Sequence, residues 1–96
     1  MNINILAQSG DFYGKVEGIR VMHCKLNSDP EEEGWYEIWG IGKDLEILLG
    51  RYQDKKIADN VFTSIIMMDD KMKRFLINGE GKILGNSYFT MPTDEY

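Results

Sequence analysis

The stretch LLGRYQDKKIADNVFTSII, residues 48–66, decides the fold, because it joins the end of a strand to the start of a helix. After the joint, apolar residues recur at the i, i+3, i+4 and i+7 positions, which predicts an amphipathic helix over residues 54–68. Asp54 stands where a helix N-cap is expected, since its carboxylate can accept hydrogen bonds from the free N–H groups of the first turn. A helix with one apolar stripe needs a sheet to cover, so the flanking residues should supply strands.

The residues before the helix predict four strands separated by turns. Each candidate strand alternates apolar and polar residues, or is rich in aromatic and β-branched residues. The four ranges are 2–7, 15–26, 35–41 and 45–50. The segments between them are rich in Gly, Asn, Asp, Ser and Pro, the residue types that favour turns. The two strands nearest the helix are joined by a three-residue turn and should form a β-hairpin.

The residues after the helix are less regular. FLIN at 75–78 fits either a short strand or the close of the helix region. NGEGK at 78–82 predicts a turn, and a last strand over 83–91 should end at Pro92. The expected order is β-β-β-β-α-β-β within a single domain, residues 1–96. We therefore predict an α+β fold in which one amphipathic helix packs on one face of a mostly antiparallel sheet.

Composition limits the possible functions. The chain has 96 residues and a net charge of −5, with no apolar run long enough to cross a bilayer. The N-terminal residues have no signal-peptide pattern, so we expect a cytoplasmic protein without a membrane partner. Much of the acidic excess lies in residues 29–37, and no basic face is evident, so we expect no nucleic-acid partner.

No catalytic or metal-binding motif is evident. His23 and Cys24 are neighbours in a predicted strand, so their side chains should point to opposite faces and could not share a metal ion. The chain contains no CxxC, HExxH, GxSxG or phosphate-loop spacing. We therefore expect a protein that is not an enzyme and has no catalytic residue, metal or cofactor.

Several strands are apolar on both faces, although one helix can cover only one. In the strand 35–41, Trp35, Trp39 and Ile41 share one face, while Tyr36 and Ile38 share the other. Three explanations are open: the sheet curls strongly, a loop covers the second face, or that face meets a copy of the chain or a partner. The two tryptophans are accordingly either core residues or anchors of an interface.

The acidic run Glu31, Glu32 and Glu33 also has two interpretations. Adjacent carboxylates beside Pro30 are typical of a solvated loop. Alternatively, the run is an acidic arm that docks on a basic partner next to Trp35.

Three segments of the chain form a set of motifs: NILAQSGDF near the start, LLGRYQDKKIADNVFTSI in the middle and YFTMP near the end. Together they resemble a group of short uncharacterised proteins of Gram-positive bacteria and their phages. The residues at the positions typical of the group are Leu49, Gly50, Tyr52, Ala58, Phe89, Met91 and Pro92. The resemblance implies a phage or prophage origin, and no activity comes with it.

Two functional hypotheses follow. The first is a non-enzymatic phage-type accessory that binds a host or phage protein, for example a defence factor, through Trp35, Trp39 and Glu31–Glu33. The second is a homo-oligomer that sequesters a small nucleotide-like ligand, whose anionic group would meet Arg20 or Arg51. Self-association fits both hypotheses.

Overall fold

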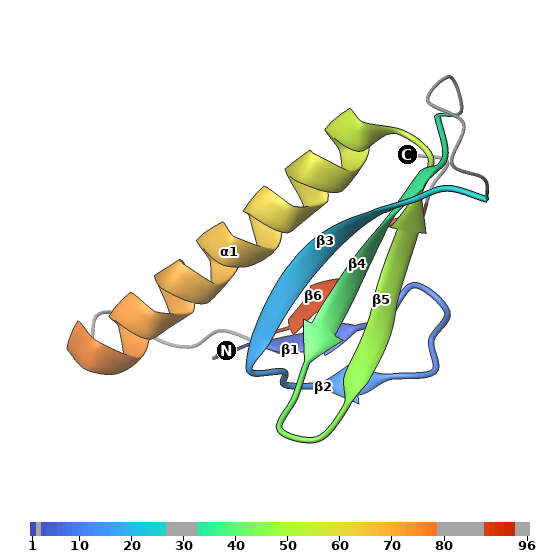
Figure 1. Ribbon diagram of the computed structural model, residues 1–96. Coiled ribbons are helices and arrows are strands. Elements are labelled where there is room, and N and C mark those ends of the chain that lie inside the picture. Colours follow the sequence, from blue (N-terminus) through green and yellow to red (C-terminus); the bar gives the residue numbers. More distant parts are fainter. Residues whose placement is uncertain (2, 27–32, 79–87, 94–96) are drawn as a thin grey trace.

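The computed structural model describes residues 1, 3–26, 33–78 and 88–93, and within them the chain forms two small sheets and one helix (Figure 1). The elements are β1 (Asn4–Leu6), β2 (Tyr13–Gly14), β3 (Gly18–Cys24), β4 (Trp35–Ile41), β5 (Glu46–Tyr52), α1 (Lys55–Asn78) and β6 (Tyr88–Thr90).

The larger sheet has the order β3-β4-β5, and both of its pairings are antiparallel. β3 and β4 pair without interruption from Gly18↔Ile41 to Cys24↔Trp35. The β4–β5 register shifts between Ile38 and Trp39, where β5 contains one extra residue. Such a bulge increases the local twist of the strand.

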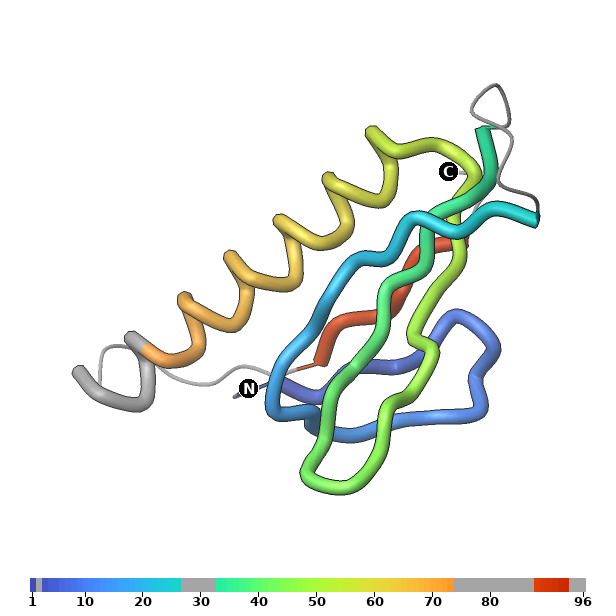
Figure 2. Tube along the Cα trace, in the orientation of Figure 1, coloured from blue at the N-terminus to red at the C-terminus, as the bar shows by residue number. Residues whose placement is uncertain are grey.

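The smaller sheet brings the two ends of the chain together. Its order is β2-β1-β6, with β1 antiparallel to β2 and parallel to β6. Figure 2 shows β1 in blue beside β6 in red. Gln8 then links this sheet to the larger one, because its backbone N–H donates to the carbonyl of Leu49 at 2.7 Å.

α1 packs across all three strands of the larger sheet. Asp54 caps its start: Oδ1 accepts a hydrogen bond from the Lys56 N–H at 2.7 Å, and the Asp54 carbonyl accepts one from Ala58 at 3.1 Å. Ala58, Val61 and Ile65 lie on one face of the helix and are buried. The i, i+3, i+4, i+7 stripe is therefore the surface that meets the sheet.

The core lies between α1, the small sheet and one face of the larger sheet. We call that side of the larger sheet the inner face. The small sheet and the segments that continue its strands contribute Ile3, Ile5, Ala7 and Met91. The remaining buried apolar residues are Val16, Ile38, Leu49, Tyr52, Ala58, Val61 and Ile65.

The joint between β5 and α1 has a structural role. Gly50 is buried, and a Cβ at this position would lie 2.9 Å from Met91 Cε and 2.9 Å from the Tyr52 ring, so only glycine fits without movement. The fully buried Tyr52 donates its hydroxyl hydrogen bond to the Pro92 carbonyl at 2.8 Å. Close packing of β5 against the C-terminal segment therefore explains these two residues.

The predicted α+β class, with one helix packed on mostly antiparallel strands, is confirmed. The element order differs in detail, because β2 is an additional strand within the predicted turn at 8–14. α1 also continues to Asn78, so of the two alternatives for residues 75–78 the close of the helix is confirmed and the short strand was wrong. The helix is longer than predicted because Met72 continues its apolar stripe and packs against the core. The turn was predicted at 78–82, but Asn78 is the last residue of α1, and residues 79–82 lie outside the described residues, as does the first part of the strand predicted at 83–91.

Candidate functional site

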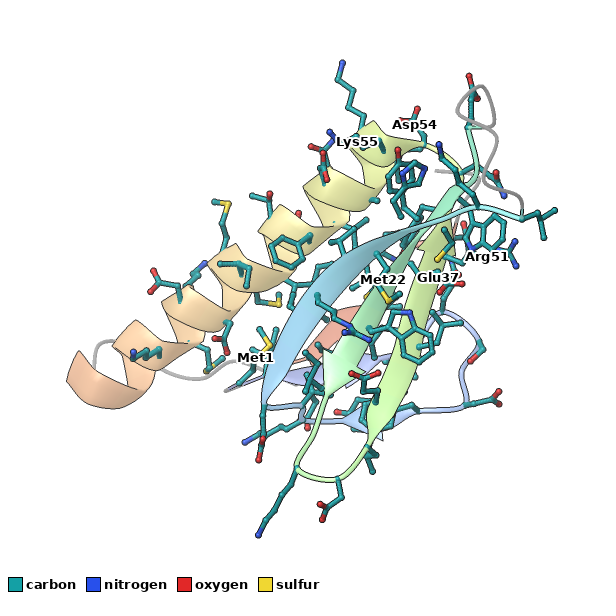
Figure 3. All side chains as sticks on the ribbon, viewed as in Figure 1. Met1, Met22, Glu37, Arg51, Asp54 and Lys55 are labelled. Carbon is teal, nitrogen blue, oxygen red and sulfur yellow. The ribbon has the colours of Figure 1, made fainter. Side chains whose placement is uncertain are left out.

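The second face of the larger sheet carries a row of aromatic, apolar and charged side chains. We call it the outer face. Opposite residues in neighbouring strands share a face, so the register defines its members. They are Arg20, Met22 and Cys24 from β3, Trp35, Glu37, Trp39 and Ile41 from β4, and Glu46, Leu48 and Arg51 from β5. Met22, Glu37 and Arg51 form one line across the three strands (Figure 3).

Glu37 lies between the two tryptophans and binds both. The indole Nε1–H of Trp35 donates to Oε2 at 2.9 Å, and that of Trp39 donates to Oε1 at 3.1 Å. Alternation along β4 places the three side chains on one face at positions i, i+2 and i+4. One carboxylate therefore fixes the orientation of both indole rings.

These hydrogen bonds keep Glu37 ionised. The Trp35 indole N–H lowers the pKa of the Glu37 carboxyl below its usual value, and Trp39, Cys24 and Arg51 act in the same direction. Partial burial opposes the shift without reversing it. Conversely, burial and the neighbouring Glu37 carboxylate raise the pKa of the Cys24 thiol. Cys24 is consequently a poor nucleophile at neutral pH, because the thiolate is the reactive form.

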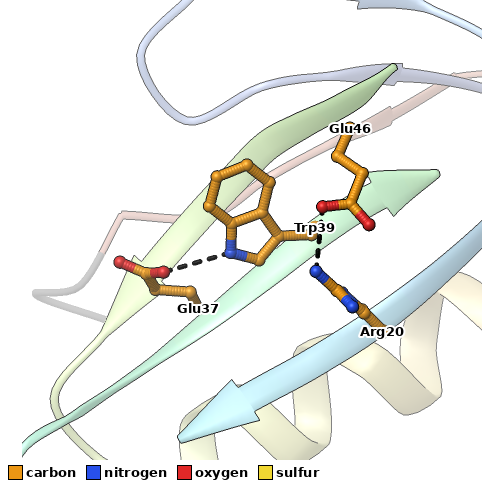
Figure 4. A network of polar contacts seen from close by, with 4 residues as sticks. All are labelled: Arg20, Glu37, Trp39 and Glu46. Carbon is orange, nitrogen blue, oxygen red and sulfur yellow. Dashed lines mark hydrogen bonds and ion pairs between the residues drawn. The ribbon is translucent and has the colours of Figure 1, made fainter. Parts of the chain in front are cut away.

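The two arginines of the outer face are both engaged within the chain. The Arg51 guanidinium lies over the Trp35 ring, with Cζ 4.3 Å from the ring centroid. Arg20 forms an ion pair with Glu46 at 2.9 Å, and both side chains are close to half exposed. Figure 4 shows Trp39 between Glu37 and the Arg20–Glu46 pair. The outer face therefore balances two acids against two bases around the indoles.

The outer face is not part of the hydrophobic core. None of its members belongs to the core cluster or to the partly buried residues that pack against it. Inner-face residues of the same strands, such as Ile19, Tyr36 and Ile47, do pack there. Trp35 and Trp39 are half-buried, while Met22 and Leu48 are 37% and 40% exposed. Among the described residues, the core that α1 and the small sheet form with the larger sheet includes only inner-face residues of that sheet.

The structure unites the residues that the sequence assigned to two separate hypotheses. Trp35, Trp39, Arg20 and Arg51 share the outer face. Glu33 is exposed just before β4, and its backbone carbonyl is 2.8 Å from His23 Nε2. Glu31 and Glu32 lie outside the described residues.

Sequence reasoning missed Glu37, Met22 and Leu48 as members of the site. Glu37 could have been found from its position, since it shares the face of Trp35 and Trp39 in any regular strand. Met22 and Leu48 depend on strand register. The bulge places Leu48 opposite Trp39, and alternation within one strand cannot predict that pairing.

The described residues contain no group of three or more His, Cys, Asp or Glu side chains arranged to hold a metal ion. His23 instead stacks on Tyr36, with the ring centroids 4.5 Å apart and an interplanar angle of 7°. α1, the helix within the described residues, is not apolar enough to cross a membrane.

A separate hollow of about 380 Å³ lies between α1 and β6. Ile57, Val61 and Phe89 form its apolar wall, and Asn60 and Ser64 contribute polar groups. Neither Arg20 nor Arg51 lines it, so the arginines proposed for an anion lie elsewhere.

Comparison of the chain with protein-family models, with curated proteins and with solved structures gives no match. The functional argument therefore rests on the geometry of the outer face.

Proposed function

We propose that this chain is a non-enzymatic binding protein that contacts another protein through its outer face. The observation that supports this best is the aromatic sheet surface outside the core, with two tryptophans, an arginine and two exposed apolar side chains. Tryptophan and arginine are enriched among the residues that dominate the energy of protein interfaces. An uncovered apolar patch on a soluble domain also favours a contact site.

The hydrogen bonds of Glu37 support this function physically. A flexible side chain loses about 0.5–1.5 kcal/mol of conformational freedom when a partner immobilises it. The indoles of Trp35 and Trp39 are already held by the Glu37 carboxylate, and Arg51 stacks on Trp35. Part of that ordering cost is therefore met before the partner arrives.

The partner class follows from the sequence resemblance and from charge. The resemblance to short proteins of Gram-positive bacteria and their phages favours a phage or prophage accessory that binds a host or phage protein, such as a defence factor, in the cytoplasm. The net charge of −5 disfavours nucleic acid.

The alternative, an oligomer that sequesters a nucleotide-like ligand, has weaker support on this face. Arg20 is paired with Glu46, and Arg51 lies over Trp35 beside the ionised Glu37. An incoming anion would meet a carboxylate between the two arginines. Native mass spectrometry of the gently purified protein distinguishes the alternatives, because a sequestering protein retains the mass of its ligand.

The binding surface can be tested by Trp39→Ala. Immobilised wild-type and variant protein are exposed to lysate of a Gram-positive host, and each captured protein is quantified by mass spectrometry. We expect Trp39→Ala to lose the specifically captured protein while its far-ultraviolet circular dichroism stays like that of wild type.

The matched control for capture is Met67→Ala. Met67 is 66% exposed on α1, so this variant also removes an exposed apolar side chain but leaves the outer face intact. It should retain capture. Equal capture by wild type, Trp39→Ala and Met67→Ala would refute the outer face as the binding surface.

A further inference from the structure

The free edge of β3 is an unusually regular pairing surface. β3 lies at the edge of the order β3-β4-β5 and pairs with β4 at all seven of its residues without a bulge. Proteins commonly block such edges with proline, a bulge or a covering segment, because an open edge exposes unpaired N–H and C=O groups. Residues 18–24 contain no proline.

The other edge of the same sheet is blocked. Gln8 covers β5: its backbone N–H donates to the Leu49 carbonyl at 2.7 Å, and its Oε1 accepts from the Arg51 N–H at 2.9 Å. No such cover reaches β3 among the described residues, where its backbone pairs with β4 alone. α1 contacts all three strands of the larger sheet, and it forms no strand pairing with β3.

A second copy of the chain can pair with this edge about a two-fold axis. In a continuous antiparallel sheet, outer-face side chains must lie opposite outer-face side chains, so only every second register is allowed. The three registers with the greatest overlap are centred on Arg20, Val21 and Met22.

Charge discriminates among these registers. If the two-fold axis passes through Arg20, the Arg20 side chains of the two copies lie opposite each other, and Lys15 of each copy lies opposite Lys25 of the other. This register places like charges opposite each other, which is destabilising. Centring on Met22 forms no pair of opposite charges within the described residues. Centring on Val21 pairs the whole of β3 with itself and brings Glu17 of each copy opposite Lys25 of the other. Both side chains are exposed, and the pair forms twice.

We propose that the chain forms a two-fold homodimer by antiparallel pairing of β3 with β3, centred on Val21 and closed at both ends by Glu17–Lys25 pairs. The dimer joins the two larger sheets into one sheet of twice the width. The outer faces of the two copies then form one continuous surface that no other described part of the dimer covers. This surface carries two Trp35–Glu37–Trp39 groups, one from each copy. This inference does not depend on the identity of any other partner.

Analytical ultracentrifugation of the wild type and five variants over a wide concentration range tests the dimer. In the dimer, Glu17→Lys places a lysine opposite Lys25 at both ends of the paired β3 strands. Lys25→Glu places a glutamate opposite Glu17 at the same two sites. We expect each single variant to raise the dimer dissociation constant about tenfold or more, since two attractive cross-strand pairs become repulsive. The double variant Glu17→Lys/Lys25→Glu exchanges the charges and should restore the wild-type constant to within about threefold.

Lys15→Glu is the control for net charge, because it changes the charge as Lys25→Glu does but lies outside the pair. It should leave association unchanged. A monomeric wild type, or single variants that associate as wild type does, would overturn the proposed edge. If Leu48→Glu on the outer face abolishes association while the charge variants do not, the two copies meet through the outer face and the β3 proposal fails.

Discussion

Glu37 is the residue on which the outer face depends. Its carboxylate accepts a hydrogen bond from each indole, and no other described residue bonds both rings. Because these bonds favour the ionised form, the folded state lowers the pKa of the carboxyl. The stability that Glu37 supplies is therefore linked to pH.

The pH dependence of unfolding tests this residue by comparing wild type with Glu37→Gln. The pKa of the Glu37 carboxyl is lower in the folded state than in the unfolded state, where it is about 4.3. The stability that results is fully present above the unfolded-state pKa and is lost as the pH falls through the folded-state pKa. We expect the difference in unfolding free energy between wild type and variant to be largest near neutral pH and to shrink in acid. A difference that stays constant from neutral to acidic pH would mean that Glu37 does not bond the indoles as an anion.

For single residues, the sequence predicted which side chains share a face of a strand, but it did not predict which face is buried. Alternation along residues 35–41 correctly placed Trp35, Trp39 and Ile41 on one face and Tyr36 and Ile38 on the other. It could not show which face meets the core. That depends on α1 and the small sheet, which pack on the Ile38 side through contacts distant in sequence.

Among the elements, α1 is the one whose start is best defined by local chemistry. Asp54 was predicted as its N-cap, and the carboxylate receives the Lys56 N–H at 2.7 Å. The end of α1 was missed, because the continuation of its stripe past the Asp69–Asp70 pair depends on tertiary packing of Met72. The start of the helix was therefore predictable from a local capping residue. The end of the helix was not, because it depends on tertiary contacts.

Asp54→Ala tests the cap. Loss of a capping carboxylate typically costs about 0.5–2 kcal/mol, so we expect the free energy of unfolding to fall by about 1 kcal/mol in urea denaturation. Asp59→Ala, at an exposed position within α1, is the control and should be neutral or slightly stabilising, because alanine favours helix interiors. Equal stability of Asp54→Ala and wild type would show that the cap contributes nothing.

For the whole molecule, the fold class was predictable but the arrangement of strands was not. The strands 35–41 and 45–50 were predicted as a hairpin and form β4 and β5. The strands are divided between two sheets. In the smaller sheet, the parallel pairing of β1 with β6 joins segments that lie more than eighty residues apart in the sequence. Periodicity describes single elements and carries no information about such pairings.

The inner face of the larger sheet builds the core, and we propose that the outer face contacts another protein. Ile38 and Trp39 are adjacent in β4 and point to opposite faces, so they form a matched pair. The direct measurement is the unfolding free energy of Ile38→Ala and Trp39→Ala by urea denaturation, followed by circular dichroism.

We expect Ile38→Ala to lose about 2–5 kcal/mol, the usual cost of emptying a core position. Trp39→Ala should lose only about 1 kcal/mol, the scale of side-chain contributions on an open sheet face. A loss from Trp39→Ala as large as that from Ile38→Ala would make Trp39 a core residue and contradict the account.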